Sequence, residues 1–142
     1  MNDNTQEIVR RVPVTSNRIP FPRDFLEKTV IERFNYVVGK VPELNAVKDM
    51  GKAYTYHELN NKTNCLAHEL IKINGKFGDQ EHAVALVLSP GAEMIIGMLG
   101  ILKAGCFFTS IDKNLPKIRV SNLLNDSKAK VIITNERHIK LV

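Results

Sequence analysis

The charged side chains that could take part in chemistry are few, and they lie near the ends of apolar runs. Lys103, Asp112, Arg119 and Asp126 are the charged residues nearest to the predicted strand ends. Ligands of open parallel sheets bind at the carboxyl ends of the strands, so Asp112 is, of these residues, the one best placed for a functional contact. Arg119 could pair with Asp112 or Asp126, and an ion pair that only fixes the loop is the simpler interpretation.

The common catalytic and phosphate-binding motifs are absent from the sequence. It contains neither a Gly-x-x-x-x-Gly-Lys-Ser/Thr run nor a Gly-x-Gly-x-x-Gly run. His57-Glu58 begins like a zinc-protease helix, but Asn61 stands where the second histidine should be. The turn at Ser89-Pro90-Gly91 could offer a helix N-terminus to an anion, but Glu93 would repel a phosphate, so we expect a simple cap. We predict no catalytic, cofactor-binding or metal-ligating residue in this chain.

Residues 83–112 predict the unit that organises the fold. Residues 83–88 and 106–111 are short apolar runs, of the length expected for strands buried on both faces. Between them lies a helical pattern with Ser89 as its cap, Pro90 at its first position and Gly105 as its left-handed stop. Two glycines inside this helix, Gly97 and Gly100, are expected to permit close packing on the sheet. Strand, helix and strand together predict a parallel crossover.

The segments before this unit predict two helices and a hairpin. Capping boxes at Thr29 and Thr55, each with a glutamate three residues later, open helices over 29–38 and 55–75. Between these helices, residues 46–50 and 52–55 flank Gly51 and predict a β-hairpin.

The segments after the central unit predict one further helix and one further strand. The helix begins at Pro116 and buries Ile118, Leu123 and Leu124, and residues 130–134 form a third buried strand. The predicted fold is therefore α/β: an open, mainly parallel sheet of βαβ units with flanking helices.

Length and composition are those of one ordinary globular domain. The chain has 142 residues, of which 44% are hydrophobic and 25% charged. The net charge of +5 is dispersed along the chain, so we do not expect a nucleic-acid partner. No apolar leader or long apolar stretch is present, which predicts a cytoplasmic protein with no membrane partner. Cys65 and Cys106 are expected to be buried free thiols in a reduced compartment.

Several separate motifs in this sequence resemble the opening of an amino-acid adenylation domain of a non-ribosomal peptide synthetase. Such domains belong to the superfamily of AMP-forming acyl, aryl and peptidyl ligases. The positions that match the family's motifs, and that the resemblance marks as mainly structural, are Tyr54, Thr55, Tyr56, Glu58, Leu59, Leu102, Lys103, Ala104, Gly105, Asp112, Pro116 and Arg119. The sequence departs from the family at Ser110 and Lys113, where prolines usually flank the Ile-Asp pair.

The resemblance also implies what the chain does not contain. A complete adenylation domain activates an amino acid with ATP and Mg²⁺, releases pyrophosphate and passes the acyl group to the phosphopantetheine of a carrier domain. The phosphate loop, substrate pocket and catalytic lysine of the family would all follow residue 142. The resemblance therefore implies an incomplete N-terminal subdomain of the adenylate-forming fold, which is inactive alone and needs no cofactor of its own.

The resemblance divides the chain into two parts. Residues 1–23 are similar to the linker between a condensation and an adenylation domain, and residues 24–142 form a partial adenylation domain. The expected partners are the missing C-terminal part and the neighbouring condensation and carrier domains. An exposed apolar face where the missing part would pack makes self-association a further expectation. Two alternatives stay open: a non-catalytic docking or scaffold module of a synthetase assembly, and an independent small nucleotide-binding domain.

Overall fold

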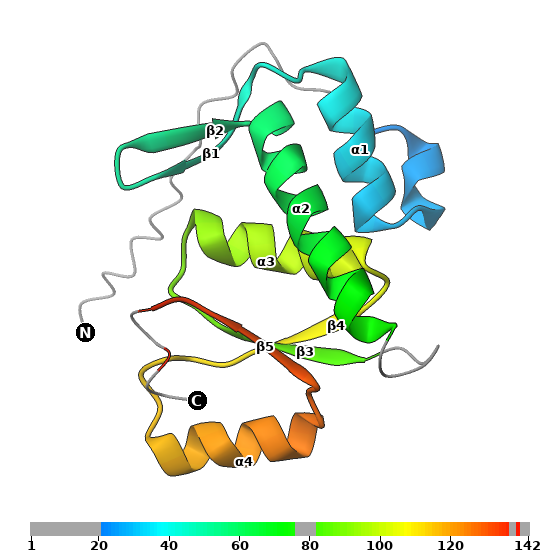
Figure 1. Cartoon of the computed structure of the whole chain (residues 1–142). Coiled ribbons are helices and arrows are strands. Elements are labelled where there is room, and N and C mark those ends of the chain that lie inside the picture. The colour runs from blue at the N-terminus through cyan, green and yellow to red at the C-terminus, as the bar shows by residue number, and fades with distance from the viewer. Residues whose placement is uncertain (1–20, 76–81, 137–138, 140–142) are drawn as a thin grey trace, which may run out of the picture.

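A three-stranded parallel sheet lies between helices that cover its two faces. The structure is a computed structural model that describes residues 21–75, 82–136 and 139. The strands are β3 (Ala83–Val87), β4 (Phe107–Ser110) and β5 (Val131–Thr134), in the order β4-β3-β5. Helix α3 (Ala92–Lys103) covers one face of the sheet, and α4 (Lys117–Ser127) covers the opposite face (Figure 1). The predicted α/β class and the parallel crossovers are confirmed.

The central strand β3 carries the core. All five of its residues are buried, and their alternation supplies one apolar cluster to each face of the sheet. Val84 and Leu86 pack on the α3 side, whereas Ala85 and Val87 pack with Val120 on the α4 side. A strand paired on both sides and covered on both faces is expected to be apolar throughout, as β3 is.

The other two strands are edge strands and are less buried than we predicted. The side chain of Phe107 in β4 is 49% exposed and that of Ile132 in β5 is 38% exposed. Apolar runs of this length predict a strand but not its place in the sheet, because an edge strand and a central strand can share the same composition. The prediction that β4 and β5 are fully buried was therefore wrong.

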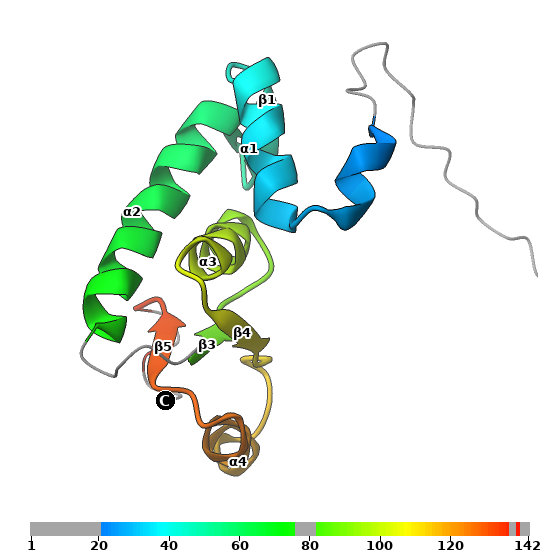
Figure 2. The ribbon, with the colours of Figure 1, turned by 90° about the vertical axis from the view of Figure 1, so that its right-hand side faces the viewer.

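A helical layer lies against the outer side of α3. It consists of η1 (Arg23–Glu27), α1 (Val30–Lys40), the hairpin of β1 (Asn45–Asp49) and β2 (Lys52–Thr55), and α2 (Tyr56–Asn74). Figure 2 shows α1 and α2 packed beside α3, with η1 on the far side of α1. Both capping boxes form as predicted, with Thr29 pairing with Glu32 and Thr55 pairing with Glu58. The hairpin forms too, with positive φ angles at Met50 (43°) and Gly51 (81°), as a tight primed turn requires.

Several local predictions need correction. Helix α3 begins at Ala92, so Pro90 is not its first residue, and the cap is not Ser89 but Gly91, which has no capping side chain. In α4 the buried residue is Val120, whereas Ile118 is 75% exposed. Cys106 is buried as expected, but Cys65 is exposed on α2.

The reason for the shifted start of α3 lies in the tertiary structure. A carboxylate from the hairpin takes the place that a local cap would occupy, as described below.

In the part of the chain that the structure describes, none of the helices has the length and apolar character needed to cross a lipid bilayer.

Candidate functional site

The family-motif positions fall into three groups, residues 54–60, 102–105 and 112–119, and the first two groups meet at the side chain of Lys103. Its Nζ donates hydrogen bonds to Oδ1 of Asn60 at 2.6 Å and to Oδ1 of Asn64 at 2.7 Å. Nζ also lies 5.0 Å from the ring centroid of Phe34, a cation–π contact to α1. Lys103 stands in the last turn of α3, where a positive charge is also favoured by the helix dipole. One ammonium group thus joins the end of α3 to α2 and α1.

The surroundings of the Lys103 ammonium are those of a charged group that stabilises the fold. The ammonium has three donor hydrogens, two of which reach amide oxygens. Its side chain is half-buried, and burial lowers the pKa of the Lys103 ammonium below its ordinary value. Because Asn60 and Asn64 are one helical turn apart, both present their side chains to the same point.

The first motif group, residues 54–60, builds the start of α2. Thr55 Oγ1 accepts a hydrogen bond from the Glu58 N–H at 3.1 Å, and the Thr55 N–H donates to Glu58 Oε2 at 2.9 Å. The ring of Tyr56 lies 6.3 Å from that of Phe34, and Lys62 Nζ lies 5.7 Å from the ring of Tyr54.

The remaining residues of this group carry no visible chemistry of their own. Leu59 is a core residue at 2% exposure. His57 is exposed, with Nε2 lying 3.0 Å from Nδ2 of Asn61. The group therefore serves to begin α2 and to fix it in the helical layer.

The second motif group, residues 102–105, ends α3. Gly105 has a φ of 73°, so it supplies the left-handed stop that we predicted. Earlier in the helix, a Cβ at Gly97 would lie 2.7 Å from Leu86 Cδ2, which confirms the close approach to the sheet. A Cβ at Gly100 would lie 2.7 Å from Leu66 Cδ2. The absence of a side chain at Gly100 therefore allows α2, and not the sheet, to pack closely against α3.

The third motif group lies apart from the other two, beside α4. Oδ1 of Asp112 accepts a hydrogen bond from the Asn114 N–H at 2.9 Å, which closes a local turn. Pro116 is the N-cap of α4, and Arg119 is exposed on its first turn. Within the described residues no ion pair joins Arg119 to Asp112 or Asp126, so the predicted pairing was wrong.

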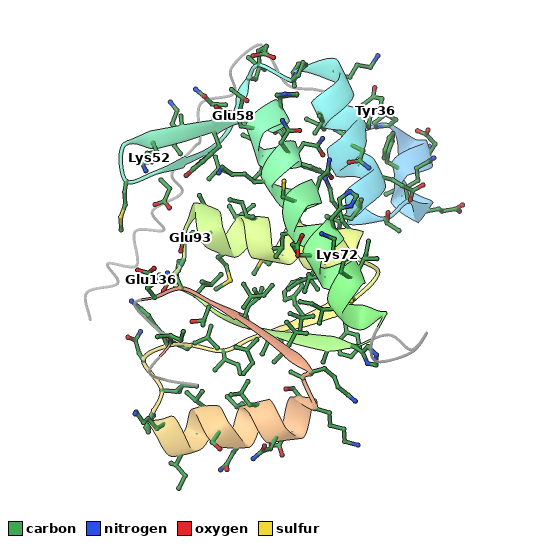
Figure 3. The ribbon with its side chains drawn as sticks, viewed as in Figure 1. Tyr36, Lys52, Glu58, Lys72, Glu93 and Glu136 are labelled. Atoms are coloured by element: carbon green, nitrogen blue, oxygen red, sulfur yellow. The ribbon has the colours of Figure 1, made fainter. Side chains whose placement is uncertain are left out.

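The carboxyl end of the sheet carries a hollow of about 520 Å³ between the hairpin, the start of α3 and the end of β5. Three of its lining residues, Lys52, Glu93 and Glu136, can be followed in Figure 3. Its floor includes Asp49 and the turn at Ser89, Pro90 and Gly91. Three carboxylates and one ammonium line it, which is a poor setting for a polyphosphate.

The described residues contain no cluster of three or more His, Cys, Asp or Glu side chains that could hold a metal ion. The three carboxylates around the hollow therefore do not form such a cluster. Of the residues singled out from the sequence, the structure brings together those of the first two motif groups, and it does so through contacts that stabilise the fold.

Comparison with known proteins identifies the family. The family model described as AMP-binding enzyme matches residues 34–142, which is most of the chain. The chain belongs to the AMP-binding enzyme family.

Relatives of this chain are large peptide synthetases. It is 38% identical over 122 residues to tyrocidine synthase 3 of Brevibacillus parabrevis, covering 86% of this chain and 2% of that protein. It is 33% identical over 129 residues to gramicidin S synthase 1 of Brevibacillus brevis, covering 91% of this chain and 11% of that protein. The chain thus spans only a small fraction of the length of the curated relatives it matches, and it corresponds to an N-terminal portion of an adenylation domain.

Solved structures agree with this assignment of the fold. A crystal structure of the nonribosomal peptide synthetase FmoA3 in an AMPPNP-bound form has a TM-score of 0.72 at 28% identity, over 78% of this chain and 12% of that chain. The N-terminal subdomain of NpsA from Klebsiella oxytoca has a TM-score of 0.66 at 22% identity, over 75% of this chain and 27% of that chain. The sheet and helical layer described above are therefore the AMP-binding fold in part.

Sequence reasoning missed three partners in these contacts. Asn60 and Asn64 hold Lys103, and the spacing of four residues between them was the signal that could have paired them on one face of a helix. Asp49 hydrogen-bonds to the start of α3, and nothing in the local sequence indicates that contact.

Proposed function

We propose that this chain forms the N-terminal scaffold of an amino-acid adenylation domain of non-ribosomal peptide synthesis. The match of residues 34–142 to the AMP-binding enzyme family is the observation on which the proposal rests. The complete domain would use ATP and Mg²⁺ to convert an amino acid into aminoacyl-AMP, and would then load the phosphopantetheine of a carrier domain.

The chain's own share in that reaction is structural. A phosphoryl or adenylyl transfer needs positioned donors around the phosphates, and the sequence contains no glycine-rich phosphate loop to supply them. The twelve motif residues would hold helices and turns: capping at Thr55, the junction at Lys103 and the helix stop at Gly105 are the contacts that support this role. None of them is proposed to touch the reacting atoms.

The division of the chain and its partners follow from the same proposal. Residues 1–23 would connect to a preceding condensation domain, and residues 24–142 would form the partial adenylation domain. Residues 1–20 lie outside the described part of the chain. Within the described part, Arg33 on α1 stacks 5.2 Å from the rings of both Phe21 and Phe25, which attaches η1 to α1. The remaining partners would be the rest of the adenylation domain and a carrier domain.

ATP-dependent exchange of radioactive pyrophosphate tests the proposed function. The 142-residue chain alone should show no exchange with any amino acid, and adding the remaining part of an adenylation domain as a separate polypeptide should restore exchange. Exchange by the 142-residue chain alone would overturn the proposal, because no phosphate-binding loop would then be needed.

A docking or scaffold module is the second candidate, and the two exposed sheet edges favour it. Phe107 on β4 and Ile132 on β5 leave exposed apolar surface on both edge strands of the sheet. A docking module would form a complex with neighbouring synthetase domains in gel filtration, and the added C-terminal part would not restore exchange. Self-association through the same edges would appear as a dimer whose amount rises with protein concentration.

A further inference from the structure

The last residue of strand β1 reaches the N-terminus of a helix far along the chain. Oδ2 of Asp49 accepts a hydrogen bond from the Ala92 N–H at 2.9 Å, across 43 residues of sequence. The bond is partly buried, between the hairpin and the carboxyl end of β3. A carboxylate at a helix N-terminus also interacts favourably with the helix dipole.

The start of α3 is built to accept this carboxylate. Its N-cap, Gly91, offers no side-chain acceptor, so Asp49 supplies the cap in place of a local residue. Gly91 has a φ of 155°, a conformation open to glycine and costly for other residues. A Cβ at Gly91 would lie 2.6 Å from Oδ2 of Asp49, so the approach of the carboxylate also requires glycine.

A second contact holds the first turn of α3 to the end of β5. Oε2 of Glu93, in the first turn of α3, accepts a hydrogen bond from Nδ2 of Asn135 at 2.8 Å. Asn135 follows directly after β5, and Thr134 Oγ1 donates to the Val87 carbonyl at 3.0 Å. The start of α3, which directly follows the turn 89–91, is therefore anchored twice, to the hairpin and to the end of β5.

We propose that Asp49 is a positioning residue that fixes the turn 89–91 to the hairpin, so that the hairpin and the carboxyl end of the sheet behave as one rigid unit. Its carboxylate sets the distance between the hairpin and the turn 89–91, which line the hollow described above on two sides. Open α/β sheets bind their ligands at this edge, so the position of the turn determines the shape that the edge presents. The inference rests on contacts within this chain and holds whether or not the proposed function is correct.

Amide hydrogen exchange of the 142-residue chain tests the role of Asp49. Asp49→Ala should raise exchange at the Ala92 amide and at the first turn of α3 by about fivefold or more, because the cap and its shielding are lost. Asp49→Asn retains an acceptor oxygen and should raise exchange less. The matched control is Asp112→Ala, which removes an aspartate that accepts a backbone hydrogen bond within its own turn and should leave the start of α3 unchanged.

Unchanged exchange at Ala92 in a folded Asp49→Ala protein, judged by its circular dichroism, would overturn the proposal. If Asp49→Ala does not fold, Asp49→Leu, which also lacks an acceptor oxygen but keeps the size of the side chain, decides. A rise confined to the start of α3 supports the proposal, and no rise, or an equal rise in all elements, contradicts it.

A double-mutant cycle gives an independent test. Gly91→Ala adds a Cβ against Asp49 and strains φ, whereas in an Asp49→Ala background only the strain of φ remains. The loss in thermal midpoint caused by Gly91→Ala should therefore be smaller in the Asp49→Ala background than in the natural chain. Equal losses in the two backgrounds would show that the two residues do not interact, and would contradict the proposal.

Discussion

The Nζ atom of Lys103 lies 2.6 Å from Oδ1 of Asn60, a residue 43 positions earlier in the chain. This hydrogen bond joins two stretches, 54–60 and 102–105, that each resemble a family motif. Neither stretch carries a group placed for catalysis in the described structure, and their shared contact instead fixes α3 against α2. The contact gives a physical reason for a lysine at the end of α3, where a leucine would have packed as well on apolar grounds alone.

Replacing Lys103 should weaken the helical layer. Lys103→Met keeps the length of the side chain but leaves the amide oxygens of Asn60 and Asn64 without their donor, which should cost about 1–3 kcal/mol of unfolding free energy. Urea unfolding measures this loss, and Lys72→Met, which breaks an exposed ion pair with Glu69, should cost less than about 0.5 kcal/mol. Equal losses of unfolding free energy for the two variants would contradict the role of Lys103 in joining α3 to α2.

The close contact between α2 and α3 should forbid any side chain at Gly100. Gly100→Ala places a Cβ within 2.7–3.0 Å of three atoms of Leu66, and should destabilise the fold by about 1–3 kcal/mol. Gly39→Ala in α1 is the matched control, because a Cβ there meets nothing within 4 Å and should stabilise the helix by about 0.4–1 kcal/mol. Thermal unfolding of the two variants should shift in opposite directions, and a stabilising Gly100→Ala would refute the contact.

The capping box of α1 should contribute to stability against acid. Hydrogen bonds from the Thr29 N–H, and then from its hydroxyl, hold the pKa of Glu32 below its ordinary value of 4.5. A carboxyl group with a lowered pKa in the folded state stabilises the fold above its unfolded pKa, and this contribution is lost as the pH falls through the folded pKa.

Glu32→Gln keeps a capping acceptor but loses the charge, so it should lower stability at neutral pH and differ least from the natural chain at pH 3, which flattens the decline of stability below about pH 4.5. Unfolding midpoints measured from pH 7 to pH 3 test this. The control, Glu27→Gln, removes an exposed carboxylate outside the capping box and should leave the acid slope closer to that of the natural chain.

Two neighbouring apolar residues of α4 should differ in their contribution to stability, because only one of them is buried. Val120→Ala removes a fully buried side chain and should cost about 1–3 kcal/mol, whereas Ile118→Ala, at a position 75% exposed, should cost less than about 0.5 kcal/mol. Chemical unfolding of both variants gives the comparison. A larger loss of stability for Ile118→Ala than for Val120→Ala would instead indicate that Ile118 is the buried residue, as the sequence predicted.

Local chemistry made part of this fold predictable. Capping boxes at Thr29 and Thr55, the hairpin turn at Gly51 and the stop at Gly105 depend on residues a few positions apart, and all four formed as predicted. The parallel crossover followed from the order of strand, helix and strand. The family resemblance rested partly on the stretches around Thr55 and Gly105, so it too could be found in the sequence.

What could not be predicted depends on contacts between distant segments. Asp49 replaces Ser89 as the partner of the helix N-terminus because the hairpin folds over the end of the sheet. Ile118 lies outside and Val120 inside because the rotation of α4 is set by Ile111 and the α4 face of β3. Arg119 forms no ion pair with Asp112 or Asp126, and Asp112 instead accepts a hydrogen bond from the Asn114 N–H in its own turn.

If this chain is the structural N-terminal part of an amino-acid adenylation domain, as we propose, it should be able to replace that part in an active relative. Residues 34–142 would replace the matching segment in an adenylation domain of tyrocidine synthase 3, and pyrophosphate exchange would be measured with each amino acid. We predict that a folded hybrid exchanges pyrophosphate with the amino-acid preference of the recipient domain. A soluble, folded hybrid with no exchange, or with a new amino-acid preference, would contradict the claim.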